Sequence, residues 1–198
     1  EVTAFAYDGE GHTVEVTPPG KPTHEMAFNA IEEMGSYTPP TIAQGNTVTL
    51  YTYDLDRNLD LVQQPGPRIV DYQYDFAGRL SAVTFPSGSI SRAYAPTTGR
   101  VVSIGGPSGV LLSMTYDGSL MKSVAFSGAV SGTVAWTHDT DFRVINETIN
   151  GAWPAAMTYD PDSLLTSADG LTLVRDPQSG RVTTATSGNV VETRTCNE

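Results

Sequence analysis

A short unit of strand and turn recurs along this sequence, and residues 70–88 form its clearest copy. Tyr72 and Tyr74 alternate with polar neighbours, which is the period of a strand with one buried face. Residues 75–78 then predict a turn, because an Asp side chain accepts hydrogen bonds from nearby backbone N–H groups and Gly adopts positive φ without steric cost. Residues 80–85 predict the return strand. Each copy is therefore expected to form one β-hairpin.

About nine copies with a period of about 21 residues cover residues 1–198. We therefore predict an all-β fold and a single repeat region instead of several different domains. No single copy can bury its own apolar face, so stability must come from the stacking of neighbouring copies. The turns begin at the pairs Tyr7-Asp8, Phe28-Asn29, Tyr53-Asp54, Tyr74-Asp75, Tyr94-Ala95, Tyr116-Asp117, His138-Asp139, Tyr159-Asp160 and Arg175-Asp176.

The second copy leaves two interpretations open. Met26, Ala30 and Met34 are four residues apart, which is a helical spacing. Aligned with the clearest copy, however, Phe28 falls on the tyrosine of the Tyr-Asp pair. The alignment favours a hairpin, followed by a small insertion at residues 41–46.

The charge balance excludes some classes of partner. Twenty-two acidic against eleven basic side chains give a formal net charge of −11, which repels phosphate backbones, so we expect no nucleic-acid partner. No run of about 18 apolar residues is present, so we expect no membrane insertion by a helix. Cys196 is the only cysteine, which excludes an internal disulfide.

The aromatic residues gather on one face of the predicted sheet. Residues i and i+2 of a strand project to the same side, so Trp136 and His138 belong with the tyrosines to a ladder of aromatic and Met side chains. Such a ladder is typical of the inner face of a sheet. Exposed aromatic rings can instead stack on sugars or fill pockets of a partner. Under that alternative the candidate ligand-binding residues are Tyr51, Tyr72, Tyr74, Trp136 and Trp153.

No motif in the sequence assembles a catalytic or metal site. Asp54, Asp56 and Asn58 have the spacing of a calcium-binding loop. The sixth and twelfth positions of that loop are Leu59 and Pro65 instead of Gly and Glu, so turn chemistry explains the acidic residues better. The three histidines lack zinc-ligand spacing, and no serine lies in a Gly-x-Ser-x-Gly motif. We therefore expect no enzyme activity and no cofactor.

The pattern Tyr-Asp-x-x-Gly-Arg-Leu, which residues 74–80 show in full, resembles the YD-repeat or Rhs-repeat family. Residues 53–59, 94–100 and 116–132 are further matches. The family includes bacterial Rhs polymorphic toxins, the B and C components of insecticidal Tc toxins, and the teneurins. The resemblance implies tandem antiparallel β-hairpins in a curved, superhelically wound sheet, which in full-length members forms a hollow shell around other domains.

The resemblance also implies a role without chemistry. We expect a non-catalytic structural segment of a larger secreted or cell-surface protein, whose native polypeptide extends beyond these residues. Its expected partners are adjoining repeats of the same polypeptide and a domain that the shell encloses or displays. The alternative is a carbohydrate- or protein-binding module that uses the aromatic residues. Asp176 and Pro177 align with the long turn of residues 94–101, so no self-cleavage is expected there.

Overall fold

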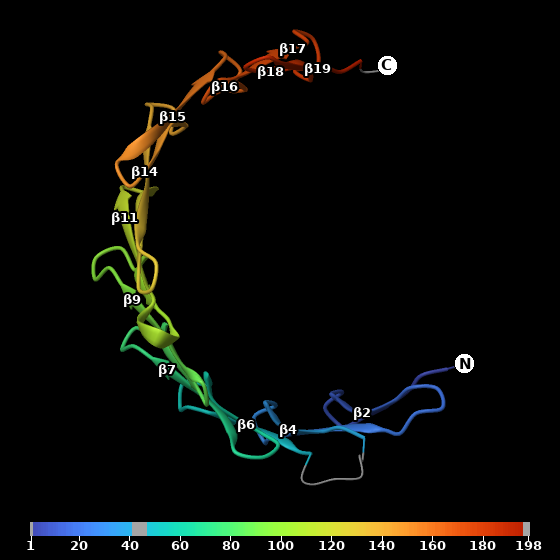
Figure 1. The fold of residues 1–198 in the computed structure, drawn as a ribbon. Helices are drawn as coiled ribbons and strands as arrows, with labels where there is room; N and C mark the ends of the chain where they lie inside the picture. Colours follow the sequence, from blue (N-terminus) through green and yellow to red (C-terminus); the bar gives the residue numbers. More distant parts are fainter. Residues whose placement is uncertain (1, 41–46, 196–198) are drawn as a thin grey trace. The chain divides into compact units, whose positions relative to one another are not determined.

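The computed structural model describes residues 2–40 and 47–195, and these residues form an all-β fold (Figure 1). The strands of the first half are β1 Ala4–Tyr7, β2 Thr13–Thr17, β3 His24–Phe28, β4 Met34–Thr38, β5 Thr49–Tyr53, β6 Leu59–Gln64, β7 Arg68–Tyr74, β8 Leu80–Phe85, β9 Gly88–Tyr94 and β10 Val101–Gly105. The strands of the second half are β11 Leu111–Asp117, β12 Leu120–Ser127, β13 Gly132–His138, β14 Val144–Ile149, β15 Ala152–Tyr159, β16 Leu165–Ala168, β17 Leu171–Arg175, β18 Val182–Ser187 and β19 Val190–Thr193.

The strands pair antiparallel in the order of the chain. Within a copy, β7 pairs with β8 across the turn at Asp75, and between copies β6 pairs with β7 across the turn at Gly66. The prediction of tandem antiparallel hairpins is therefore confirmed. The second copy forms β3 and β4, so the strand interpretation of that copy is confirmed as well. The predicted insertion at residues 41–46 and Cys196 lie outside the described residues.

Helical structure is nearly absent from the described residues. The 3-10 helix η1, Pro107–Gly109, is the only helical element there. No helix in the described ranges is long and apolar enough to cross a membrane.

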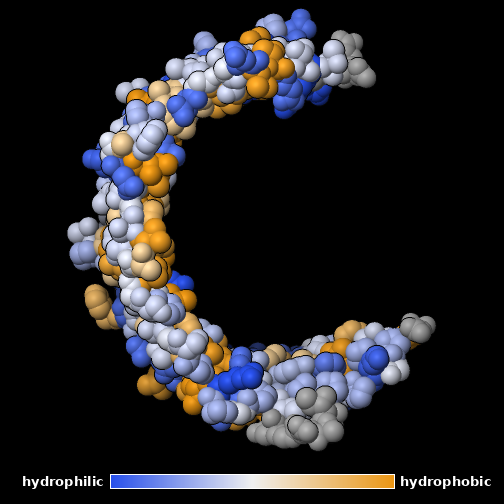
Figure 2. Space-filling view, viewed as in Figure 1, coloured by the Kyte–Doolittle hydropathy of each residue, from blue (hydrophilic) through white to orange (hydrophobic). Residues whose placement is uncertain are grey.

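The chain divides into two compact units, one made of residues 1–93 and 104–108 and the other of residues 94–103 and 109–198. Each unit is a single layer of strands. Among the described residues only Val62 is buried, with 8% of its surface exposed. Figure 2 shows apolar and polar residues side by side on the face in view. Most apolar side chains of each unit thus remain partly exposed. Both units consist of the same hairpin repeat. That residues 1–198 form a single repeat region instead of several domains stays a prediction.

A β-bulge stands at the turn end of the hairpins. In the clearest copy Gln73 pairs with Ala82 while Tyr74 pairs with Leu80, so Ser81 is an extra residue on the return strand. The same shift of register occurs between β1 and β2, β3 and β4, β5 and β6, β11 and β12, β13 and β14, β15 and β16, and β17 and β18. A bulge interrupts the ladder and turns a backbone group away from its partner strand.

Candidate functional site

The carboxylate of Asp75 organises the turn of the clearest copy. Its Oδ1 accepts the N–H groups of Ala77 at 2.9 Å and Arg79 at 3.0 Å, and its Oδ2 accepts Nε–H of Arg79 at 2.8 Å. The hydrogen bond from the Arg79 guanidinium holds the pKa of this carboxyl below its ordinary value. The two backbone N–H groups lower the pKa further, whereas partial burial opposes the shift. Gly78 takes the left-handed conformation at φ 73°. The turn predicted from the sequence is therefore confirmed.

An Asp or Asn side chain accepts the same backbone hydrogen bonds at other turns. The two backbone bonds to the first side chain recur at the turns that begin at Asp8, Asn29, Asp54, Asp139 and Asp160. At the candidate calcium loop, Oδ1 of Asp54 accepts the N–H groups of Asp56 and Asn58, and Oδ2 accepts the Asn58 amide. Both carboxylate oxygens of Asp54 thus accept hydrogen bonds from groups of the turn itself.

The left-handed position of the turn is not reserved for glycine. The sequence predicts Gly at this left-handed position, as at Gly78. Four other turns place a different residue at φ between 64° and 67°, namely Glu32, Arg57, Phe142 and Ser163. The Asp or Asn side chain that accepts backbone N–H groups on both sides of this position is the shared signal in the sequence.

The residues just before these turns are here named the tyrosine column, and tyrosines of this column join one copy to the copy before it. The hydroxyl of Tyr74 donates to the carbonyl oxygen of Leu59 at 2.9 Å. Leu59 is the residue that precedes the extra residue of the preceding bulge. The same bond joins Tyr53 to Met34 at 3.0 Å, Tyr116 to Val101 at 2.8 Å, and Tyr159 to Val144 at 2.7 Å.

The register of the strands explains why a tyrosine is needed there. The ladder between β6 and β7 begins at Leu61 and Asp71, so Tyr72 to Tyr74 have no backbone partner on β6. The tyrosine side chain lies where the two strands separate, and its hydroxyl satisfies the carbonyl that the bulge has turned away. Burial, with smaller contributions from nearby Asp54, Tyr72 and Asp60, raises the pKa of Tyr74, so the hydroxyl remains a donor at neutral pH.

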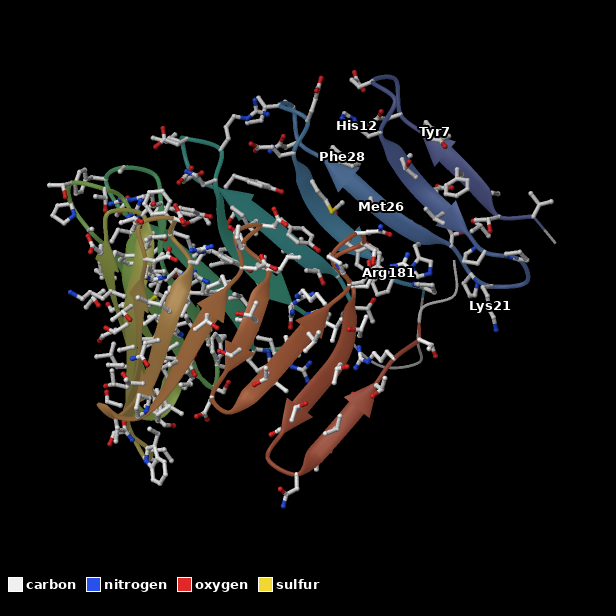
Figure 3. The ribbon with its side chains drawn as sticks, turned by 90° about the horizontal axis from the view of Figure 1, so that it is seen from above. Tyr7, His12, Lys21, Met26, Phe28 and Arg181 are labelled. Carbon is white, nitrogen blue, oxygen red and sulfur yellow. The ribbon has the colours of Figure 1, made fainter. Side chains whose placement is uncertain are left out.

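Three copies hold a different residue in the tyrosine column. Arg175 keeps the connection, because its guanidinium donates to the Leu165 carbonyl at 3.2 and 3.1 Å. Phe28 has no hydroxyl, and its ring instead stacks on the His12 ring with centroids 4.4 Å apart, as Figure 3 shows. The third is His138, whose side chain forms no hydrogen bond within the described part of the chain.

The structure places the five candidate ligand-binding residues in different environments. Four are half-buried on their strands: Tyr51, Tyr72, Tyr74 and Trp136. The indole N–H of Trp136 donates to a carboxylate oxygen of Glu147 at 2.7 Å. Trp153 is 81% exposed and has a left-handed backbone at φ 53°. Tyr72 and Tyr74 line one hollow of about 480 Å³ in the first unit, and Trp136 lines another of about 600 Å³ in the second. The role of the five residues in ligand binding stays a prediction.

Comparison with known proteins identifies the repeat. Residues 2–198 match the family model described as Teneurin YD-shell, and no curated protein matches the chain. The solved structure of TcdB2-TccC3 has a TM-score of 0.67 and 14% identity, over 94% of this chain and 13% of that chain. TcdB2-TccC3 without the hypervariable C-terminal region has a TM-score of 0.65 and 14% identity, over 92% of this chain and 12% of that chain. At such identities the likeness shows the fold, and this chain spans a small part of the solved chains.

The tandem antiparallel hairpins and the family match together make this a YD-shell protein. The chain belongs to the Teneurin YD-shell family. The relationship to YD repeats that the sequence predicted is thereby confirmed.

Proposed function

We propose that this chain is a non-catalytic wall segment of a larger YD shell, which is secreted or held at a cell surface and which encloses or displays another domain. The family match and the fold likeness to TcdB2-TccC3 support a structural role. The hydrogen bonds of the Asp turns and of the tyrosine column support it too, because the former close the hairpin within a copy and the latter join neighbouring copies.

The observation that carries the proposal is the single layer of strands. A sheet is normally stabilised by burying one face against a second layer, yet only Val62 is buried among the described residues. The half-buried aromatic and aliphatic side chains of the ladder are therefore open to further contacts. A domain enclosed by the shell would supply such contacts to one face of the sheet.

The edge strands support the same proposal. In the first unit β1 pairs with β2, and Phe5 and Tyr7 of β1 remain 55% and 61% exposed. In the second unit β19 pairs with β18, and Val190 and Val191 remain 71% and 61% exposed. Edge strands present unpaired N–H and C=O groups to which further strands add. Adjoining repeats of the same polypeptide are the proposed partners of both edges.

An antibody raised against this chain tests the proposal on the native protein. Immunoblots of the source cells and their medium should show a band far above the 21.1 kDa of this chain, in the medium or at the cell surface. Electron microscopy of the purified native protein should then show a closed shell. A native band near 21.1 kDa, or a large protein without a shell, would contradict the proposal.

We propose a second, binding role for Trp153, which is favoured by its exposure on the strand β15. Aromatic side chains that stand free of the surface are frequent anchors in partner pockets and on sugar rings. Binding of the chain to a glycan array or to the native partner should disappear in Trp153→Ala, while its far-UV circular dichroism stays unchanged. Equal binding by Trp153→Ala and the unaltered chain would contradict this role.

A further inference from the structure

Two neighbouring turns of the first unit carry large apolar side chains that the turn itself does not need. Leu55 follows Asp54 in the turn that joins β5 to β6, and Phe76 follows Asp75 in the turn that joins β7 to β8. Both side chains are fully exposed, so neither packs on the sheet. At the equivalent turns of the described residues the same position holds a small or polar residue or a proline: Gly9, Ala30, Pro96, Gly118, Thr140, Pro161 and Pro177. The fold therefore does not explain Leu55 and Phe76.

The two turns have the same hydrogen bonds, so Leu55 and Phe76 project from the sheet in the same way. Oδ1 of Asp54 accepts the N–H groups of the residues two and four positions later, and Oδ1 of Asp75 does the same. The turns lie at the same edge of the sheet, since β5, β6, β7 and β8 pair in order. Two strand spacings separate the turns, which places them roughly 10 Å apart.

A third apolar side chain continues this row at the preceding turn. Ile31, in the turn that joins β3 to β4, is 52% exposed. The Arg57 guanidinium donates to the carbonyl oxygen of Ile31 and, at 2.9 Å, to a carboxylate oxygen of Glu33, which holds this turn against the next one. We call Ile31, Leu55 and Phe76 the apolar tips. Together they extend over roughly 20 Å, because each step spans two strands.

The surroundings of the apolar tips are acidic. Residues 29–33, 54–60 and 75–79 carry six carboxylates and two guanidiniums. Arg57 pairs with Glu33, and Arg79 pairs with Asp75. The other four carboxylates form no ion pair within the described ranges, and they belong to Glu32, Asp54, Asp56 and Asp60. This edge therefore favours a cationic partner and disfavours nucleic acids and anionic membranes.

The spacing of the apolar tips fits an α-helix better than an extended segment. Side chains seven positions apart lie on the same face of a helix, and seven residues rise by about 10.5 Å, which is close to the spacing of the tips. An extended segment covers this distance in about three residues, and side chains three positions apart in a strand project to opposite faces. A helix with an apolar stripe can thus contact successive tips, whereas a strand cannot.

We propose that the apolar tips dock a basic amphipathic helix of a partner protein. The apolar stripe of the helix covers Leu55 and Phe76, with Ile31 at the end of the row. Lys and Arg side chains that flank the stripe lie against the four carboxylates that have no ion pair. This docking surface goes beyond the role of a wall segment and does not depend on that role.

A synthetic amphipathic peptide of about 20 residues, made of Leu and Lys only, tests the surface by fluorescence anisotropy. We expect saturable binding that weakens by about tenfold or more when Leu55→Ser and Phe76→Ser are combined. Both residues are fully exposed, so the double variant should keep the far-UV circular dichroism of the unaltered chain. Val130→Ser changes a residue that is 74% exposed in the second unit, and this matched control should bind the peptide as the unaltered chain does.

The sign of the charge is tested with a second peptide, in which Glu replaces every Lys. This peptide should not bind. Equal binding of the Leu-Lys peptide by the double variant and the unaltered chain would overturn the docking surface, and equal binding of the two peptides would overturn the requirement for a basic partner.

Two further measurements separate other occupants of the apolar tips. Sedimentation velocity would show self-association of the unaltered chain that the double variant lacks, if the tips served a second copy of this chain. Flotation with phosphatidylcholine vesicles would show binding that the double variant lacks, if the tips served a lipid surface. We expect neither result, and either one would overturn the assignment to a partner helix.

Discussion

At the scale of single residues, the hydroxyl of the tyrosine column joins neighbouring copies. Tyr74→Phe removes the donor to Leu59 and leaves a carbonyl at a bulge without that partner. We expect the free energy of unfolding, measured with urea, to fall by about 1 kcal/mol. Tyr72→Phe is the matched control, because the Tyr72 hydroxyl forms no hydrogen bond among the described residues and its loss should cost clearly less. Equal losses in the two variants would show that the hydroxyl has no special role.

The left-handed position of the Asp turns gives a second prediction for single residues. Gly78 has φ 73°, and a Cβ added there would meet nothing within 4 Å, so Gly78→Ala tests the backbone alone. We expect a loss of about 1 kcal/mol, because L residues are strained in this conformation. Glu32 occupies the same position at φ 67°, so Glu32→Gly should relieve strain and raise the melting temperature. A rise for Gly78→Ala, or a fall for Glu32→Gly, would contradict this account.

At the scale of the element, the Asp turns make the stability of the sheet depend on pH. The pKa of Asp75 is lowered by the Arg79 guanidinium, that of Asp54 by the Asn58 side chain, and that of Asp176 by the Ser179 N–H and hydroxyl. A carboxyl whose pKa is lower in the folded state stabilises the fold above the pKa of the unfolded chain. This contribution is lost as the pH falls through and below about 3.9, the ordinary Asp value.

Thermal unfolding between pH 7 and pH 3 measures this contribution. We expect the melting temperature to change little down to about pH 5 and then to fall as Asp protonates. Asp75→Asn keeps an oxygen for the backbone N–H groups but carries no charge for Arg79, so it should be less stable than the unaltered chain at pH 7 and nearly as stable at pH 3. A constant difference in melting temperature between the two proteins from pH 7 to pH 3 would mean that the charge of Asp75 does not contribute to stability.

The turns and strands could be predicted from the sequence because their causes are local. Alternation around Tyr74 and the chemistry of Asp75 are visible in a few adjacent residues. The bond from Tyr74 to Leu59 could not be predicted, since it depends on the bulge between β5 and β6, which turns one carbonyl toward the next copy. His138 did carry a visible signal as a histidine among tyrosines. That its side chain forms no hydrogen bond among the described residues could not be predicted, because this depends on where the ladder between β12 and β13 ends.

At the scale of the whole molecule, each copy is stabilised mainly by its neighbours. The protection of a strand's amides against hydrogen exchange should therefore increase with the number of strands that pair with it. The strands β7 and β14 pair on both sides, whereas β1 pairs with β2 and β19 with β18 at the edges of their units. Amide hydrogen exchange should therefore be slow in β7 and β14 and much faster in β1 and β19. Tyr74→Phe should speed exchange in the copies that flank the altered junction and leave β17 and β18 unchanged. Uniform protection along the chain would mean that all copies open in one cooperative step, which nearest-neighbour stabilisation does not predict.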